Sequence, residues 1–155
     1  MPHWGYSIRQ LPLRSVKASG RELDISPKDA REICRAIKGM KVTEAESFLK
    51  DVIAMRRSVP YRRYRKKVAH KRGLQGWYAG RYPVKAAKAI LKILQSAMAS
   101  AEEQDLDVDS LYVYHAAAYK GRVLKRYIER AFGRTSPWNR VLVHVELVLS
   151  EEKPQ

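Results

Sequence analysis

The sequence predicts an α+β fold, because the spacing of its apolar residues changes once along the chain. Between residues 26 and 104, three stretches repeat apolar residues every three to four positions, which is the period of helices that pack one face on a core. From Leu111 onward the repeat falls to two, which is typical of strands. A length of 155 residues and a hydrophobic content of 45% suit a single domain over residues 1–155.

Each helical stretch carries its own start signal. Ser26 can cap the first helix, Pro27 fits its first turn, and Gly39 ends it. A capping box that opens at Thr43 starts the second helix, and the third is expected over residues 83–104. The apolar stripes expected to face the core are Ala30, Ile33, Cys34 and Ile37, then Ala45, Phe48, Leu49, Val52 and Ile53, then Ala87, Ile90, Leu91, Leu94, Ala97 and Met98.

Two alternating stretches in the final third predict a β-hairpin. One holds Val141, Val143, Val145, Leu147 and Leu149, and the other holds Leu111, Val113, His115, Ala117 and Tyr119. Residues 120–140 between them carry charge on both faces, so they would extend from the core as an arm. About ten residues beyond the core, at ~3.3 Å per residue, would reach roughly 30 Å. An isolated ribbon is barely stable in water, so the arm needs a surface to lie against. Near the start of the chain we expect an extended arm at 1–20 and a short strand at 21–25.

The basic residues concentrate in two segments. Lys and Arg outnumber Asp and Glu by 31 to 16, which gives a formal net charge of +15. Residues 56–81 hold ten cations and no acid, residues 111–149 hold seven cations and two acids, and the remainder of the chain sums to zero. Charge this concentrated favours a polyanionic partner, because cations gain affinity for nucleic acid by releasing counterions from phosphates.

Aromatic rings are interleaved with the charges of the first segment. Tyr61 and Tyr64 flank basic residues, and Trp77, Tyr78 and Tyr82 follow. Rings can stack on unpaired bases while cations follow the backbone, which favours RNA, and the sequence has no helix-turn-helix pattern or zinc-finger spacing to favour DNA. The segment is too long and too charged to pack by itself, so we expect it to become ordered only against a partner.

The remaining motifs do not predict catalysis or metal binding. Ser47 and Lys50 match a Ser-x-x-Lys pattern, but the residues between them belong to a helical stripe and the companion motifs are missing. The four histidines lack ligand-like spacing, and Cys34, the single cysteine, is expected to be a buried hydrophobe. One cysteine allows no internal disulfide, which fits a reducing cytoplasm. Without an apolar run of ~18 residues or a secretory signal, we expect a cytoplasmic protein with no membrane span, catalytic residue or cofactor.

Several stretches resemble one known family. The sequence ISPKDAR at 25–31, together with residues 37–49, is similar to the opening helices of the universal large-subunit ribosomal protein twenty-two family. KGR at 120–122 and RAFGR at 130–134 resemble the hairpin signature of that family. The resemblance covers about residues 12–150.

This resemblance implies a fold and a function. The fold would be three helices packed on a small three-stranded antiparallel sheet, with a long protruding β-hairpin and a basic insertion loop at 56–81. The insertion looks like one that archaeal and eukaryotic members carry, and the short acidic tail favours the archaeal type. The function would be that of a structural protein that binds large-subunit ribosomal RNA during assembly. Its globular part would lie near the exit of the nascent-peptide tunnel, with the hairpin along the tunnel wall.

The predicted contact residues follow from the basic segments and from this resemblance. RNA contacts are expected at Arg56, Arg57, Arg62, Arg63, Arg65, Lys66, Lys67, Lys71, Arg72, Arg81, Lys120, Arg122, Lys125, Arg126, Arg130, Arg134 and Arg140. The tunnel-proximal tip is expected at Tyr127, Ile128, Glu129, Ala131, Phe132, Gly133 and Thr135. Gly133 would permit a positive φ in the turn. Glu129 stands where the family often has a proline, so it would pair with a neighbouring Arg or face the tunnel lumen.

The expected partners are large-subunit ribosomal RNA, neighbouring large-subunit proteins and the nascent polypeptide, without a membrane or a second copy of the chain. The same basic loop also fits a different class of protein, a free-standing RNA chaperone or single-strand RNA-binding protein. Sedimentation with the large subunit, or apart from it, separates these two interpretations.

Overall fold

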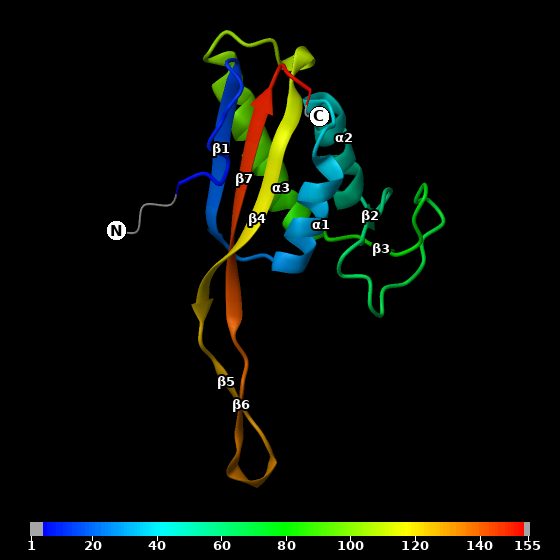
Figure 1. The fold of residues 1–155 in the computed structure, drawn as a ribbon. Coiled ribbons are helices and arrows are strands. Elements are labelled where there is room, and N and C mark those ends of the chain that lie inside the picture. The colour runs from blue at the N-terminus through cyan, green and yellow to red at the C-terminus, as the bar shows by residue number, and fades with distance from the viewer. Residues whose placement is uncertain (1–4, 154–155) are drawn as a thin grey trace.

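A three-stranded antiparallel sheet runs the length of the protein body (Figure 1). The computed structural model describes residues 5–153. Within it, β7 (Arg140–Ser150) lies between β1 (Ser15–Leu23) and β4 (Tyr112–Leu124), and both pairings are antiparallel. Because β7 has a neighbour at each edge, it is the best-protected strand, and all of residues 143–150 are buried.

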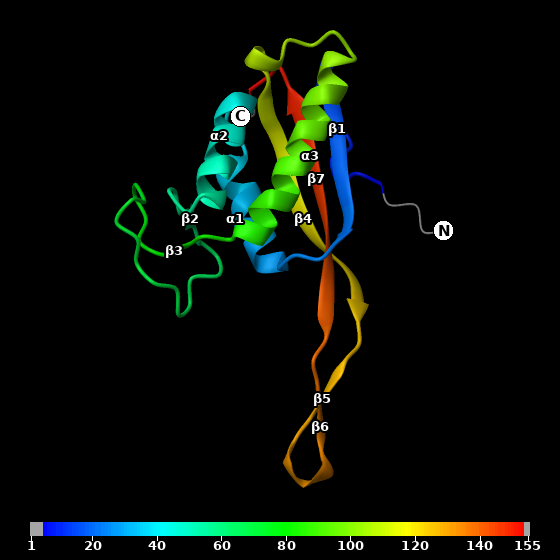
Figure 2. The same cartoon turned by 180° about the vertical axis from the view of Figure 1, so that it is seen from behind.

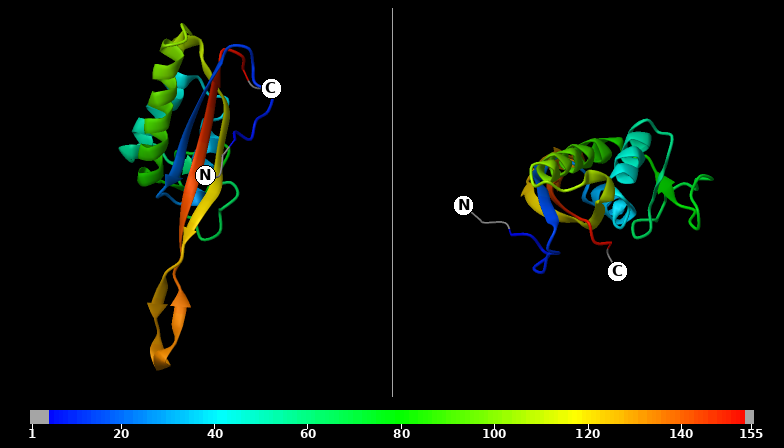
Figure 3. Two further views of the ribbon diagram at one scale, coloured as in Figure 1. Left: turned by 90° about the vertical axis from the view of Figure 1, so that its left-hand side faces the viewer. Right: turned by 90° about the horizontal axis from the view of Figure 1, so that it is seen from above.

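Three helices cover one face of this sheet, which confirms the predicted α+β fold (Figures 2 and 3). They are α1 (Pro27–Ile37), α2 (Val42–Ile53) and α3 (Val84–Glu102). Their apolar stripes meet alternate residues of the central strand, namely Val143, Val145, Leu147 and Leu149, in one continuous core. No helix among the described residues has the length and apolar composition needed to cross a bilayer.

The predicted helix starts are right for α1 and wrong for α2. The hydroxyl of Ser26 caps α1 as expected. The capping box at Thr43 does not form, because α2 begins at Val42 with Lys41 as its N-cap and with no side chain accepting there. The Val42 backbone N–H donates instead to the carbonyl oxygen of Leu111 at 3.0 Å, just before β4. Contact with the sheet therefore replaces the side-chain cap.

The buried face of α3 is broader than the predicted stripe. Ala87, Ile90, Leu94 and Ala97 are buried as expected, whereas Leu91 and Met98 are only partly buried. Ile93 is buried as well, at 7% exposure. α3 packs on both α2 and β1, so two partners cover more of its circumference than one would.

Strand β1 begins earlier than predicted. Residues 15–20, expected to lie in an extended arm at 1–20, already pair with β7 from Ser15 onward. The short strand expected at 21–25 is the end of this longer one. Val16 is the only fully buried residue of β1, so the edge strand has no apolar period that could reveal it. The first four residues of the predicted arm lie outside the described part of the chain.

The N-terminal segment crosses the sheet face that the helices leave open. The Ser7 backbone N–H donates to both carboxylate oxygens of Glu146 at 3.2 Å, and the Ser7 hydroxyl also donates to this carboxylate. His115 Nε2 lies 3.2 Å from Glu146 Oε1. Burial raises the pKa of Glu146, but hydrogen bonds from Ser7, His115 and Tyr119 outweigh it and lower the pKa overall. A charged, fully partnered carboxylate thus holds the N-terminal segment against β7.

Two short ribbons lie outside the main sheet and carry the basic segments. β2 (Val59–Pro60) pairs with β3 (Gly80–Arg81) at the base of the loop between α2 and α3. β5 (Tyr127–Glu129) pairs with β6 (Thr135–Pro137) in the long hairpin. The remaining elements are single 3₁₀ turns, η1 (Val108–Ser110) before β4 and η2 (Ala131–Gly133) at the hairpin tip.

Leu94→Ala is expected to lower the free energy of unfolding by roughly 2–5 kcal/mol, because Leu94 is fully buried in the core face of α3. Urea denaturation followed by circular dichroism measures the change. Lys88→Ala, at an exposed position of the same helix, is the control and should alter stability by less than about 0.5 kcal/mol. A change that small in Leu94→Ala would contradict the burial of this helix face.

Replacing residues 126–137 with an Asn-Gly turn should leave the body folded and its unfolding cooperative. Nearly all of these residues are exposed, and the Trp138 backbone N–H donates to the carbonyl oxygen of Arg126 at 2.6 Å, so the two ends to be joined are adjacent. Differential scanning calorimetry of the shortened chain tests this expectation. Loss of a cooperative transition would show that the hairpin tip contributes to the core.

Candidate nucleic-acid interface

The basic loop, residues 56–81, returns to the body through close backbone contacts. The Tyr61 N–H donates to the carbonyl oxygen of Ala79 at 2.9 Å. At Gly80 a Cβ atom would lie 2.7 Å from Leu74 Cδ1 and 3.1 Å from the Val59 carbonyl oxygen. A side chain at position 80 would force Leu74 or the Val59 backbone to move, so glycine suits the point where the two sides of the loop approach each other.

A buried carboxylate of α1 organises the first half of this loop. Glu32 is 1% exposed, and its two oxygens accept the backbone N–H groups of Arg62 at 3.1 Å, Arg63 at 2.9 Å and Tyr64 at 3.0 Å. Three hydrogen-bond donors to one carboxylate compensate its loss of hydration. The basic loop is therefore tied to α1 through its backbone, which leaves the cationic side chains free to point outward.

Tyr61 forms a second anchor between the loop and α1. Its ring is 2% exposed, and its hydroxyl donates to Asp29 Oδ1 at 2.7 Å. Burial and then the neighbouring Asp29 carboxylate raise the pKa of Tyr61, so the hydroxyl stays protonated. The expectation that this segment cannot pack within its own chain is wrong, because Tyr61 and Glu32 attach it to the body. Tyr61 is also unavailable for stacking on a base.

Several cations of the loop lie over aromatic rings of the same loop. The guanidinium groups of Arg62 and Arg65 lie 5.3 Å and 5.9 Å from the Trp77 ring centroid, and the Trp77 indole N–H donates to the Tyr61 carbonyl oxygen at 2.9 Å. Trp77 also stacks on Tyr78 with 4.9 Å between centroids. Cation–π contacts of this kind restrict the directions in which the charges point.

The predicted RNA contacts of the loop are almost all exposed. All of them are exposed except Lys71, which is partly buried with its ammonium group 5.2 Å from the Tyr82 ring. Within residues 5–153 none of these cations forms an ion pair. Their charge is thus not compensated by ion pairs within the described part of the chain.

The second basic segment is the long hairpin, which extends beyond the body in Figure 1. β4 and β7 remain paired as far as Leu124 and Arg140, and the short ribbon of β5 and β6 continues the arm. Every residue from 124 to 135 is exposed. The predicted contacts at Lys120, Arg122, Lys125, Arg126, Arg130 and Arg134 are likewise exposed.

The hairpin tip reverses the chain with two residues in the left-handed region. Gly133 has φ of 63°, as predicted, and Phe132 has φ of 59° and is 97% exposed. The Arg130 N–H closes the turn on the carbonyl oxygen of Arg134 at 2.8 Å. Glu129 forms no ion pair in the described residues, so its predicted pairing with a neighbouring Arg is not found.

Arg140 differs from the other predicted RNA contacts because it has an ion-pair partner, Asp24, within the chain. Its Nε donates to Asp24 Oδ1 at 2.5 Å, and a second nitrogen reaches the other oxygen. Lys85 Nζ lies 2.6 Å from the same carboxylate. These hydrogen bonds, that of Arg140 first, lower the pKa of Asp24 to about 2, so the carboxylate is ionised at any physiological pH. Arg140 therefore fixes the hairpin base to the body, a role that the sequence analysis missed.

The one cysteine of the sequence lies buried in the core. Cys34 is 2% exposed, and burial raises its pKa to about 12, which fits the predicted buried hydrophobe. His115 and His144 lie on the paired strands β4 and β7. Among residues 5–153 there is no group of three or more His, Cys, Asp or Glu side chains that could hold a metal ion.

Comparison with known proteins matches the sequence to one family. The sequence profile of ribosomal protein L22p/L17e matches residues 18–150. The chain belongs to the ribosomal protein L22p/L17e family. It is thus a structural, non-enzymatic ribosomal protein.

Individual members of the L22p/L17e family are similar over nearly the whole chain. Large ribosomal subunit protein uL22 of Methanopyrus kandleri is 52% identical over 153 residues, which cover 96% of both chains. The protein of that name from Methanocaldococcus jannaschii is 53% identical over 94% of both chains, and that from Archaeoglobus fulgidus is 55% identical over 87% of both. These relatives confirm the predicted archaeal type.

Two acidic residues of the L22p/L17e chain anchor the basic loop, and counting charges along the sequence could not identify them. Asp29 and Glu32 lie three residues apart on α1, so they share a helix face beside the apolar stripe. That spacing is the one signal that the sequence offers for them. Their partners come from about thirty residues further along the chain and are brought together only by folding.

Glu32→Gln is expected to loosen the basic loop, because an amide offers one acceptor oxygen where three backbone N–H groups need partners, and its NH₂ group opposes them. Trypsin should cleave faster after Arg62, Arg63 and Arg65, and the free energy of unfolding should fall by roughly 1–3 kcal/mol. Limited proteolysis with mass spectrometry measures the first effect. Glu44→Gln is the control, since it removes the same charge from an exposed position of α2. Equal cleavage of the two variants would refute the anchoring role of Glu32.

Proposed function

We propose that this L22p/L17e protein is a cytoplasmic, structural component of the large ribosomal subunit and binds large-subunit ribosomal RNA. The basic loop and the long hairpin would make the contacts, and the nearly neutral body would hold both in place. Family membership supports the proposal, as do relatives named as large ribosomal subunit proteins. RNA and neighbouring large-subunit proteins would be the partners, without a second copy of this chain.

The hairpin is the observation that carries this proposal. Its residues from 124 to 135 are exposed, including the large apolar side chains of Tyr127 and Phe132, at 67% and 97%. A ribbon without a core gains nothing from folding on its own body. It needs a surrounding surface, and Lys125, Arg126, Arg130 and Arg134 match that surface to phosphates.

We further propose that the hairpin tip lines the nascent-peptide tunnel while the globular part lies near its exit. The tip residues from Tyr127 to Thr135 combine exposed apolar groups with a single acid, Glu129. Glu129 would face the tunnel lumen, because it has no cationic partner within the described residues and a carboxylate is repelled by phosphate.

Sedimentation of a cell lysate tests the ribosomal assignment against a free-standing RNA chaperone. The tagged chain is expected in the large-subunit peak at moderate salt. A chain that stays at the top of the gradient, or that spreads over many RNA classes, would support the chaperone and overturn the ribosomal role.

The combined variant Arg62→Glu and Arg63→Glu tests the contact role of the basic loop. Both side chains are exposed, and neither has an ion-pair partner within the described residues. Reversing their charges should therefore reduce affinity for large-subunit RNA by about tenfold or more and weaken the salt dependence of binding. Filter binding at several salt concentrations measures both. Lys88→Glu with Lys92→Glu on α3 is the control, because it changes the net charge by the same amount on another element. Equal losses in the two double variants would mean that total charge, and not the loop, sets the affinity.

A further inference from the structure

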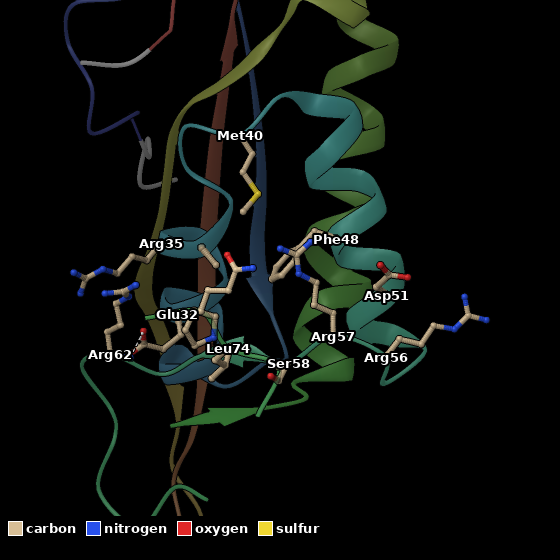
Figure 4. Close-up of a pocket in the computed structure, with 14 residues that line it drawn as sticks. Glu32, Arg35, Met40, Phe48, Asp51, Arg56, Arg57, Ser58, Arg62 and Leu74 are labelled. Carbon is tan, nitrogen blue, oxygen red and sulfur yellow. Dashed lines mark hydrogen bonds between the residues drawn. The ribbon is translucent and has the colours of Figure 1, made fainter. Parts of the chain in front are cut away.

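A groove of about 780 Å³ opens between α1, the end of α2 and the basic loop (Figure 4). This volume lies within the ~300–1,000 Å³ of typical small-molecule sites. Its apolar lining includes Met40, which points into the space, Phe48 from α2 and Leu74 from the loop. Met40 and Leu74 are partly exposed, so an apolar surface is accessible from solvent there.

Four arginines line the groove, and the side chain of one of them, Arg56, points away from the apolar residues (Figure 4). Arg35 and Arg62 lie on one side of the groove, Arg57 lies against Phe48, and Arg56 lies beyond it (Figure 4). The Arg57 guanidinium is 4.9 Å from the Phe48 ring centroid. All four side chains are exposed, and none has an ion-pair partner among residues 5–153.

The two acids of the groove offset only part of the charge of the four arginines. The Glu32 carboxylate is already taken up by three backbone N–H groups of the loop. Asp51 is the other acid in the lining, against four arginines. A ligand that fits must therefore combine negative charge with an apolar surface.

We propose that the groove binds one unpaired nucleotide of RNA. Its base would lie against Met40 and Leu74 and beside the Arg57 guanidinium, which covers the buried Phe48 ring, and its phosphate would be held by Arg35 and Arg62. Aromatic and guanidinium planes stack on bases, and an Arg fork can hold a phosphate bidentately. The inference rests on the proposed function. It adds a defined single-nucleotide site to a surface whose other cations are expected to contact the RNA backbone.

The position of the groove favours RNA over an acidic peptide. Arg62, Leu74 and Gln75 line it and belong to the basic loop, so the groove is continuous with the proposed RNA-binding surface. A nucleotide flipped out of RNA that lies on the loop would reach the groove without a second binding partner. A peptide from a neighbouring protein would have to enter between the loop and that RNA.

Photo-crosslinking in assembled large subunits tests the site. The full chain carries p-benzoylphenylalanine in place of Gln75, which is exposed and lines the groove, or in place of Lys66, which is exposed on the loop outside it. Primer extension locates crosslinked nucleotides. We expect Gln75 to crosslink to a single unpaired nucleotide and Lys66 to crosslink to different RNA positions.

The other outcomes separate failure of the groove from failure of the proposed function. Crosslinks from Lys66 to RNA, with Gln75 joined to protein, to paired RNA or to nothing, would overturn the nucleotide site and leave the ribosomal role intact. Absence of RNA crosslinks at both positions, together with loss of the chain from the large-subunit peak, would overturn both.

Met40→Glu provides an independent measurement. A carboxylate at the apolar surface should repel the nucleotide and lower affinity for large-subunit RNA at least about fivefold, whereas Met55→Glu, which adds the same charge at an exposed position outside the groove, should lower it by less than about twofold. Met40 is partly exposed, and thermal unfolding of both variants verifies that the body remains folded. Equal affinities of the two variants would exclude the groove as a contact.

Discussion

A chain with a net charge of +15 must hold like charges close together, and three carboxylates around the start of α1 make this possible. Asp24 pairs with Arg140 at the hairpin base and with Lys85 at the start of α3. Asp29 accepts a hydrogen bond from the Tyr61 hydroxyl, and Glu32 accepts hydrogen bonds from the backbone N–H groups of residues 62–64 in the basic loop. Both cationic segments are thus attached to one short stretch of the chain. Their relative position follows from the fold before any polyanion is present.

The sequence allowed prediction of elements that bury a repeating apolar stripe, such as α1, α3 and β7. It revealed only the end of β1, because an edge strand with Val16 as its only buried residue has no period to detect. The start of α2 depends on a bond from Val42 to Leu111, far along the chain. Similarly, the exposure of the basic residues followed from their charge, whereas the engagement of Arg140 and the burial of Glu32 depend on partners that only folding brings near.

The two basic segments would meet RNA in different ways. The loop already has a defined backbone, since Glu32 and Tyr61 hold it and ring contacts restrict its cations. The loop would therefore lose little further conformational entropy on binding RNA, so more of its interaction free energy would appear as affinity. The hairpin has no such support, and its conformation would become restricted only between surrounding surfaces.

The central position of β7 also has a mechanical consequence. This strand continues from the hairpin base at Arg140 to Ser150 at the far end of the body, with ladders on both sides. Backbone hydrogen bonds in antiparallel ladders lie perpendicular to the strands. A pull along the hairpin would therefore load many bonds of both ladders at once and would not open them one after another. The arm is exposed and thin, yet it is connected to the part of the molecule that best resists traction.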